Sequence, residues 1–486
     1  MVLERFDARP RSQPPRGPHR STLRARVDLL VLLYGSDELV ALRGLTPRRV
    51  TWTRNRPAVA DELSVTLDSD TLPFDLRLVA SAVVTCWLYE HRDPARCKLG
   101  DPGVFTGRLD RIRRSRKGDV DIEARDYTGS LLDAKLDGQR LAKVDLTTAP
   151  SLTEVCRSIL RLVPNTETWR VETVGVAGKF STLATYSKRE KVKPKTDGAP
   201  ADAPKKALTR RRSTIATLLK GESLSAWEAI CKVCALLGAV PEVDVEPVSG
   251  FPRLRVIDAL AAQSSDMLRP FGRNDGQPRY MVVGHNVALL EETLELGSAD
   301  GMPDFVRVTA LNPDTGETLT AVYPDEEASP LTPAQYKRWL KDANGSQQVA
   351  DGVSNLAQLR KLAQIAFEDA RKNELRIKLE TWQTWTTGGG PQDADLLDLG
   401  AGATLDVRFV GFDRLDTTAT DVLRRRGLPA EVAAAIARAQ ERVFVGQDSL
   451  RFRVGQVVHT LTLEEQPSYS CEVELSTFLG GRRPQV

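Results

Sequence analysis

Apolar and polar residues alternate in many short runs of the chain, with the period of two that is typical of half-buried β-strands. The clearest runs are residues 24–34, 49–54, 63–67, 304–310, 318–323, 375–379 and 469–475. Residues 83–89 instead carry apolar or aromatic side chains on both faces, which predicts a strand buried on both sides. We therefore expect strands at both ends of the chain.

The segment from Phe105 to Gly129 predicts a β-hairpin, because its apolar positions alternate before and after a turn at Ser115-Arg-Lys-Gly-Asp119. Four basic residues gather at or beside the tip: Arg113, Arg114, Arg116 and Lys117. They form either a solvated tip or a contact for a polyanion. Charged residues are common at hairpin ends, which favours the solvated tip.

Two helices and three strands in the middle of the chain predict a two-layer α+β unit. Ser151-Leu-Thr-Glu154 fits a capping box, and the apolar residues after it share one helix face. A second helix is expected over residues 224–237, ended by Gly238. The strands are expected at residues 168–176, 241–248 and 254–258, and further helices at 356–367 and 431–443.

Two segments have the composition of flexible chain. Residues 1–23 combine arginines with prolines, and residues 188–212 hold ten Lys or Arg against three acids, also with prolines. The second segment has no interleaved aromatic residues, so a stacking surface for single-stranded nucleic acid is not indicated.

Composition indicates a soluble globular protein, with 41% hydrophobic and 27% charged residues. The net charge of +3 on 486 residues excludes a polyanion binder that acts through the charge of the whole molecule. The chain begins with charged residues and prolines, so a signal peptide is not expected. The apolar run Leu29–Tyr34 is far shorter than a bilayer requires, and no membrane-spanning segment is expected.

The residue types that bind metals or cofactors do not form recognisable motifs, and we predict no catalytic, cofactor-binding or metal-ligating residue and no cofactor. Cys231 and Cys234 lie on the apolar stripe of a predicted helix, without a second pair at zinc spacing, and are interpreted as core. The four histidines also lack zinc spacing: His19, His91, His285 and His459. Neither a phosphate-binding loop nor a Gly-x-Ser-x-Gly motif is present.

Three weaker candidates for chemistry remain. The pairs Glu291-Glu292 and Glu464-Glu465 are a possible glycosidase acid and base, although adjacent acids are usually solvated surface. Trp382 and Trp385 flank a glycine-rich loop and are either a sugar platform or, as we favour, core or interface residues. Gly284-His285-Asn286 offers a base beside an amide, with no nucleophile evident.

The order of short motifs resembles the baseplate hub proteins of tailed phages and related injection particles, of the late control protein D type. Relatives of this family form the N-terminal hub part of the type VI secretion spike. The motifs are Asp61–Leu67 followed by Leu72-Pro-Phe-Asp-Leu76, then Phe105-Thr-Gly-Arg-Leu-Asp110, Ala124-Arg-Asp-Tyr-Thr-Gly-Ser-Leu-Leu-Asp133, Leu224–Gly238, Pro278-Arg-Tyr-Met-Val-Val-Gly-His-Asn286 and Val306–Pro324. Together they span most of residues 24–480.

The resemblance implies an α+β, β-rich fold with two tail-tube-like β-barrel domains and a small α+β domain between them. The implied division is a basic arm at 1–23, a first barrel at 24–145, an α+β domain at 146–300 with a basic insertion at 180–222, and a second barrel with inserted helices at 301–486. The chain is expected to be a structural homotrimer that adapts a six-fold tail tube to a three-fold central spike and surrounds a channel. No catalytic or cofactor residue is implied.

The implied location is the baseplate of a virion tail or tail-like particle, assembled in the host cytoplasm. The implied partners are the tail tube, central spike, tape measure and other baseplate proteins, with transient contact to DNA in the channel. A spike or wall hydrolase is expected to be a separate protein, since no such module follows Leu475. The alternatives are a cell-wall-degrading enzyme acting through its paired acids and a nucleic-acid-binding protein acting through its basic segments.

Overall fold

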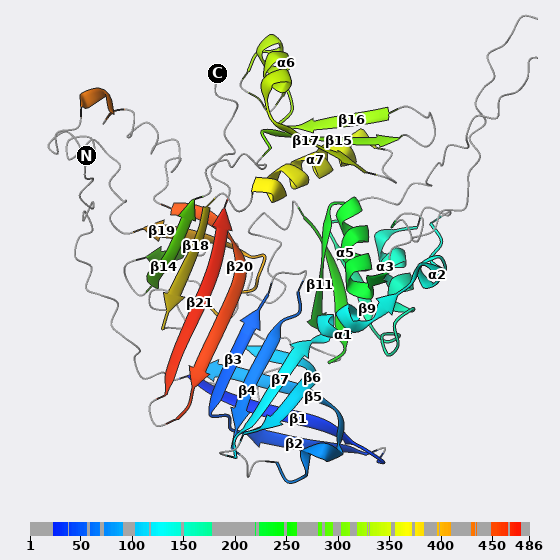
Figure 1. Cartoon of the computed structure of the whole chain (residues 1–486), viewed down its shortest axis with the longest axis vertical. Helices are drawn as coiled ribbons and strands as arrows, with labels where there is room; N and C mark the ends of the chain where they lie inside the picture. The colour runs from blue at the N-terminus through cyan, green and yellow to red at the C-terminus, as the bar shows by residue number, and fades with distance from the viewer. Residues whose placement is uncertain are drawn as a thin grey trace, which may run out of the picture.

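The computed structural model confirms a strand-rich α+β fold (Figure 1). It describes residues 23–36, 38–55, 59–68, 72–90, 103–115, 118–146, 150–176, 219, 223–246, 250–259, 280–283, 287–294, 303–311, 318–327, 329, 331–350, 355–371, 375–382, 396–397, 399–409, 429–432, 434, 449–464 and 467–477. The predicted arm, the basic segment 188–212 and nearly all of the predicted helix 431–443 lie outside these ranges.

A single large sheet contains strands from both ends of the chain, in the order β19-β13-β14-β18-β21-β20-β3-β4-β7-β6-β5-β1-β2. Its N-terminal strands are β1 (Leu23–Leu33), β2 (Leu39–Leu45), β3 (Arg49–Arg54), β4 (Glu62–Leu67), β5 (Val79–Glu90), β6 (Val104–Arg114) and β7 (Val120–Asp126). Its C-terminal strands are β13 (Tyr280–Val283), β14 (Val287–Leu294), β18 (Leu375–Thr381), β19 (Thr404–Phe409), β20 (Ser449–Thr462) and β21 (Ser468–Thr477). Because β19 also pairs with β20, the six C-terminal strands close a circuit.

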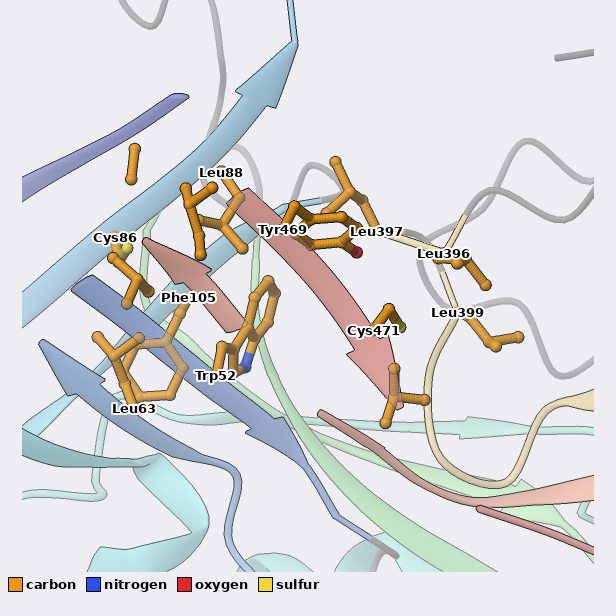
Figure 2. Packing of buried hydrophobic residues seen from close by; sticks show 14 of the residues in the cluster. Trp52, Leu63, Cys86, Leu88, Phe105, Leu396, Leu397, Leu399, Tyr469 and Cys471 are labelled. Atoms are coloured by element: carbon orange, nitrogen blue, oxygen red, sulfur yellow. The ribbon is translucent and has the colours of Figure 1, made fainter. Parts of the chain in front are cut away.

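One hydrophobic core lies inside this sheet and takes side chains from both halves of the chain. Strict alternation produces it: Val50 and Trp52 on β3 point inward, as do Tyr469, Cys471 and Val473 on β21. Figure 2 shows Trp52 between Phe105 on one side and Tyr469 and Cys471 on the other. The two halves are therefore packed against each other as well as hydrogen-bonded.

The predicted hairpin is confirmed as β6 and β7, and its turn has Gly118 at φ 97°. The prediction for residues 83–89 was only partly correct. Val84, Cys86 and Leu88 are buried in the core, whereas Val83, Trp87 and Tyr89 face the other side of β5 and are half-buried.

The α+β unit is confirmed in its element order, in the capping box at Ser151 and in the end of the second helix before Gly238. Its long helices are α3 (Leu152–Leu160) and α5 (Ala226–Leu236), which begin with capping boxes at Ser151 and Ser225. They pack on a sheet of β11 (Ala239–Val245), β12 (Pro252–Asp258) and β9 (Arg170–Val174). The short elements α1 (Tyr127–Asp133), β8 (Lys135–Leu136), α2 (Gly138–Leu141) and β10 (Leu224–Ser225) complete it.

A further small unit lies within residues 305–371, which we call the 305–371 unit. It consists of the sheet β16-β15-β17 with α6 (Pro333–Asp342) and α7 (Leu356–Arg371), where the strands are β15 (Phe305–Leu311), β16 (Thr318–Tyr323) and β17 (Gly345–Val349). Val306, Val308 and Phe367 lie in its own core. This unit interrupts the C-terminal strands of the large sheet between β14 and β18.

The structure corrects two predicted boundaries. Residues 127–145 were assigned to the first barrel, but Leu131, Leu136 and Leu141 lie in the core of the α+β unit. Residues 280–294 were assigned to the α+β domain, but β13 and β14 belong to the large sheet, where Met281 and Val287 are fully buried. Their partners β19 and β18 come about 80 or more residues later in the chain. Local sequence pattern carries no signal for such distant pairing. The division into two barrel domains remains a prediction.

Candidate functional site

Strand β20 joins the two halves of the large sheet and is the centre of the candidate site. Its first residues pair with β19, from Ser449 to Arg453, and its last residues pair with β3, from Val457 to Thr462. An irregularity in the pairing with β21 falls between Val454 and Gln456, where the partner of β20 changes. We call the contact of β3 with β20, together with residues 55–61 and 396–399, the joint.

Aromatic side chains fill the buried centre of the joint. His459 on β20 lies opposite Trp52 on β3, and their ring centroids are 5.6 Å apart. The His459 Nδ1 lies 2.9 Å from the Tyr469 hydroxyl on β21. Burial lowers the pKa of His459 to about 3, with a smaller contribution from Arg54, so the imidazole is neutral at physiological pH. This histidine is a core residue of the joint rather than a metal ligand or a surface base.

Arg54 at the end of β3 ties the joint to residues 396–399. Its guanidinium is buried, with 8% of the residue exposed, and its Nη1 donates hydrogen bonds to the carbonyls of Leu397 (3.1 Å) and Leu399 (3.0 Å). The same group lies 4.6 Å from the ring centre of Trp52. A buried arginine needs such partners, because its charge is costly to desolvate without them. Arg54 was not predicted as a site residue, because no local motif distinguishes it from the many other arginines of the sequence.

Amide hydrogen bonds reinforce the joint beside Arg54. The Gln456 Nε2 donates to the Asn55 Oδ1 (2.8 Å) across 401 positions of sequence, and the Asn55 Nδ2 donates to the Ala60 carbonyl (2.7 Å). The Asn55 backbone N–H donates to the Asp61 carboxylate (2.7 Å). Asn55, which follows β3, is thereby held to Gln456 on β20 and to Ala60 and Asp61, which precede β4.

Three carboxyl groups gather where the joint meets the α+β unit: Asp61, Asp126 and Glu242. Desolvation raises the pKa of Asp61 to about 6 and that of Glu242 to about 7, with Arg54 partly opposing both shifts. Desolvation and the charge of Asp61 raise the pKa of Asp126 well above its ordinary value. Asp126 is also the N-cap of α1, so this group connects the sheet to the first helix of the α+β unit.

The cysteines of the predicted helix are core residues, as expected. Cys234 on α5 is fully buried, and its Sγ lies 4.0 Å from that of Cys156 on α3. Burial raises the pKa of the half-buried Cys231 to about 12 and that of Cys234 well above its ordinary value, so both thiols stay protonated. Within the described ranges, no group of three or more His, Cys, Asp or Glu could hold a metal ion.

The structure does not bring the remaining chemical candidates together. Glu291 and Glu292 are exposed on β14, and Glu464 is exposed after β20. Trp382 is half-buried after β18. The other candidates lie outside the described residues: His19, His91, the segment 284–286 with His285, Trp385 and Glu465.

The basic residues of the β6–β7 hairpin form ion pairs with nearby acids. Arg113 and Arg111 both form ion pairs with Glu123 on β7, the second at 3.2 Å. Arg125 pairs with Asp110 and with Asp133, the second at 3.0 Å. Arg48 pairs with Asp119 in the turn at 2.9 Å. The run of acids in the hairpin is thus the cross-strand complement of the run of bases, which favours a solvated tip over a polyanion contact. Arg116 and Lys117 lie outside the described residues.

Neither a protein-family model nor a curated protein matches the chain. Among solved structures, the tail protein from Neisseria meningitidis MC58 is similar with a TM-score of 0.46 and 14% identity, over 95% of this chain and 99% of that chain. The 43 kDa tail protein of prophage MuSo2 from Shewanella oneidensis has a TM-score of 0.45 and 13% identity, over 93% and 98% of the two chains. The E. coli c3393 protein, a component of the type VI secretion system, has a TM-score of 0.36 and 8% identity, over 94% and 79%.

These structures belong to the classes of protein that the sequence resembles, namely tail proteins and components of the type VI secretion system. At such identities the similarity concerns the fold alone and identifies no equivalent residues. The helices of the described ranges include none that is long and apolar enough to cross a membrane.

Proposed function

We propose that this chain is a structural baseplate hub of a phage tail or tail-like injection particle. It acts as a homotrimer, adapts a six-fold tail tube to a three-fold central spike, and surrounds the channel. The observation that carries the proposal is the β3–β20 joint, which unites a closed circuit of six strands with a seven-stranded sheet around one core. Three such chains supply six strand-rich bodies, as a junction between six-fold and three-fold parts requires.

The chemistry of the described residues supports a structural role without catalysis. Two strongly perturbed titratable groups, His459 and Asp61, lie at the joint, and Glu242 lies beside it on β11. His459 and Asp61 are tied into it by hydrogen bonds to Tyr469 and Asn55. Rigid, dry contacts of this kind suit a part that bears load between assembled rings. The proposed partners are the tail tube, central spike, tape measure and other baseplate proteins, with DNA passing in transit.

The mass of the purified chain in solution tests the proposal. We expect light scattering over a concentration series to give a species of three chain masses, about 160 kDa from the 53.5 kDa chain. Negative-stain images of that species should show a ring with a central channel. A chain that stays monomeric at all concentrations and does not assemble on tail tube protein would contradict the proposal.

A second measurement separates the structural role from the enzymatic alternative. The purified chain is incubated with cell-wall polysaccharide, next to a variant with Glu464→Gln. We expect no wall hydrolysis from either. Wall hydrolysis by the wild type that is lost in the variant would show that the chain is an enzyme and would contradict a purely structural role.

A further inference from the structure

The large sheet has two edges that carry no strand partner among the described residues. The first is β2, the last strand in the sheet order, which pairs only with β1. The second is β14 beyond Val287, because its ladder with β13 consists of the single pair Val283 and Val287. From Ala288 onward, β14 pairs only with β18 among the strands described. Open edges of this kind readily accept another strand.

Both edges expose large apolar side chains to water, which is unfavourable. Leu39 on β2 is 59% exposed, and Leu30 beside it on β1 is 39% exposed. Leu290 and Leu294 on β14 are 48% and 47% exposed. Neither strand contains a proline or lysine, the residues that commonly protect an edge from pairing. The composition of the two edges is therefore that of contact surfaces.

The charges of the two edges are opposite. Arg43 on β2 is exposed and forms no ion pair with any described residue. On β14, Glu291 and Glu292 are exposed and point to opposite faces of the strand. Glu291 lies opposite Lys378 on the outer face, whereas Glu292 lies opposite the buried Ile377. Arg43 is also on the outer face, because its neighbour Leu42 pairs with the buried Leu29. The neighbouring strands extend the acidic side with Glu380, Glu472 and Glu474. The pKa of Lys378 is raised by its contact with Glu472, with smaller contributions from Glu474 and Glu291. The β2 edge is thus basic and the β14 edge of the same chain is acidic, so the two edges are electrostatically complementary.

The two edges of one chain are far apart and therefore require two copies to meet. In Figure 1, β2 lies at the bottom of the molecule, whereas β14 lies in the upper half, at the left of the C-terminal strands. Because the edges differ, their contact is head-to-tail, and such contacts form a ring when the rotation closes.

We propose that the β2 edge of one copy pairs with the β14 edge of the next copy, with Arg43 facing Glu291 on the outer face, so that the large sheet continues from chain to chain around the ring. The inference rests on the proposed homotrimeric hub and names the surface that builds it. Pairing would cover the exposed leucines and satisfy the open backbone groups of both strands.

Charge reversal tests the contact. The variants Arg43→Glu and Glu291→Arg each place like charges across the proposed interface, and the double variant restores an opposite pair. We expect each single reversal to raise the dissociation constant of the trimer about tenfold or more in sedimentation velocity, and the double variant to recover most of the loss. The matched controls Arg338→Glu on α6 and Glu326→Arg before it change exposed charges on the 305–371 unit and should have no effect.

Hydrogen exchange provides a readout that does not depend on substitutions. On assembly of the wild-type chain, backbone amides of residues 39–43 and 288–294 should gain protection. The amides of β17, an edge strand of the smaller sheet that exposes Val349, should not.

The outcomes separate this inference from the proposed function. A trimer that withstands both reversals, or that gains no protection at β2 and β14, overturns the edge pairing and leaves the hub intact. Reversals that weaken the trimer and are not rescued in the double variant also overturn it. A wild-type chain that does not self-associate at any concentration removes the trimer and the edge pairing together.

Discussion

The rings of His459 and Trp52 face each other across the β3–β20 strand pair, with centroids 5.6 Å apart. One residue comes from the last strands of the chain and the other from the first. Both are buried, and the Tyr469 hydroxyl fixes the orientation of the imidazole. The contact between the two halves is therefore a packed, buried interior rather than a solvated hinge, with the Arg54 guanidinium as its buried charge.

The burial of His459 predicts a loss of stability in acid. The folded-state pKa of about 3 lies below the ordinary value of 6.5, so the unfolded chain binds a proton more readily between these values. The free energy of unfolding should fall as the pH drops from about 6.5 towards 3, by up to about 1.4 kcal/mol per pH unit from this group. The free energy of unfolding, measured by urea titration at several pH values, should therefore fall more steeply with decreasing pH in the wild type than in His459→Gln. An equal dependence of the free energy of unfolding on pH in the two proteins would show that the imidazole is not buried in its neutral form.

Asp61 predicts the opposite dependence on pH. Its pKa of about 6 in the folded chain exceeds the model-compound value of 3.8, so stability from this group is present below about pH 4 and is lost as the pH rises through 6. The Asp61→Asn variant keeps an oxygen acceptor for the Asn55 N–H and removes the charge. It should be more stable than the wild type by about 1–2 kcal/mol at pH 8, with the difference vanishing near pH 4. The exposed control Glu464→Gln should show no such gain. A loss of stability at pH 8 on substituting Asp61 would indicate that its charge is compensated.

Removal of Arg54 should loosen the joint more than removal of other arginines on the same strand. Arg54→Met loses two hydrogen bonds to the 396–399 segment and should cost about 2–4 kcal/mol in the free energy of unfolding. The exposed control Arg49→Met should cost less than about 0.5 kcal/mol. Hydrogen exchange of residues 396–405 should also accelerate in the first variant alone. Equal effects of the two substitutions would contradict the role of Arg54.

Gly107 is required by the close approach of β6 and β7. A Cβ added there would lie 2.2 Å from the Arg125 carbonyl oxygen, and backbone cannot move aside as a flexible side chain can. Gly107→Ala should therefore force the strands apart and destabilise the protein by about 1–3 kcal/mol. Gly400→Ala is the matched control, since a Cβ there meets nothing within 4 Å. A neutral result at Gly107, measured by thermal unfolding, would show that the strands can separate at little cost.

Local structure was largely predictable from the sequence, because it depends on neighbours in the chain. The capping boxes at Ser151 and Ser225 and the turn at Gly118 are set by short-range hydrogen bonds and a positive φ, and all three are present. The inward residues of α3 were also predicted and are all buried.

The joint was not predictable in this way. Arg54 and Gln456 carry no local pattern, and their roles arise only when strands 400 positions apart become neighbours. The same applies to Asp61, whose raised pKa depends on desolvation by distant segments. His459 was noticed as a residue type, but a single histidine does not indicate whether it will be buried or exposed.

The pairing of β3 with β20 also affects folding during synthesis. One edge of β3 stays without its partner until a strand about 400 residues further along the chain has been synthesised, as the Asn55–Gln456 hydrogen bond shows. At typical translation rates this interval lasts roughly 20–80 s. During it, one edge of β3 has no partner, and β20 of a second copy of the chain could pair with it as well as β20 of the same chain. We therefore expect exchange of β20 between chains to be a misfolding route of this topology.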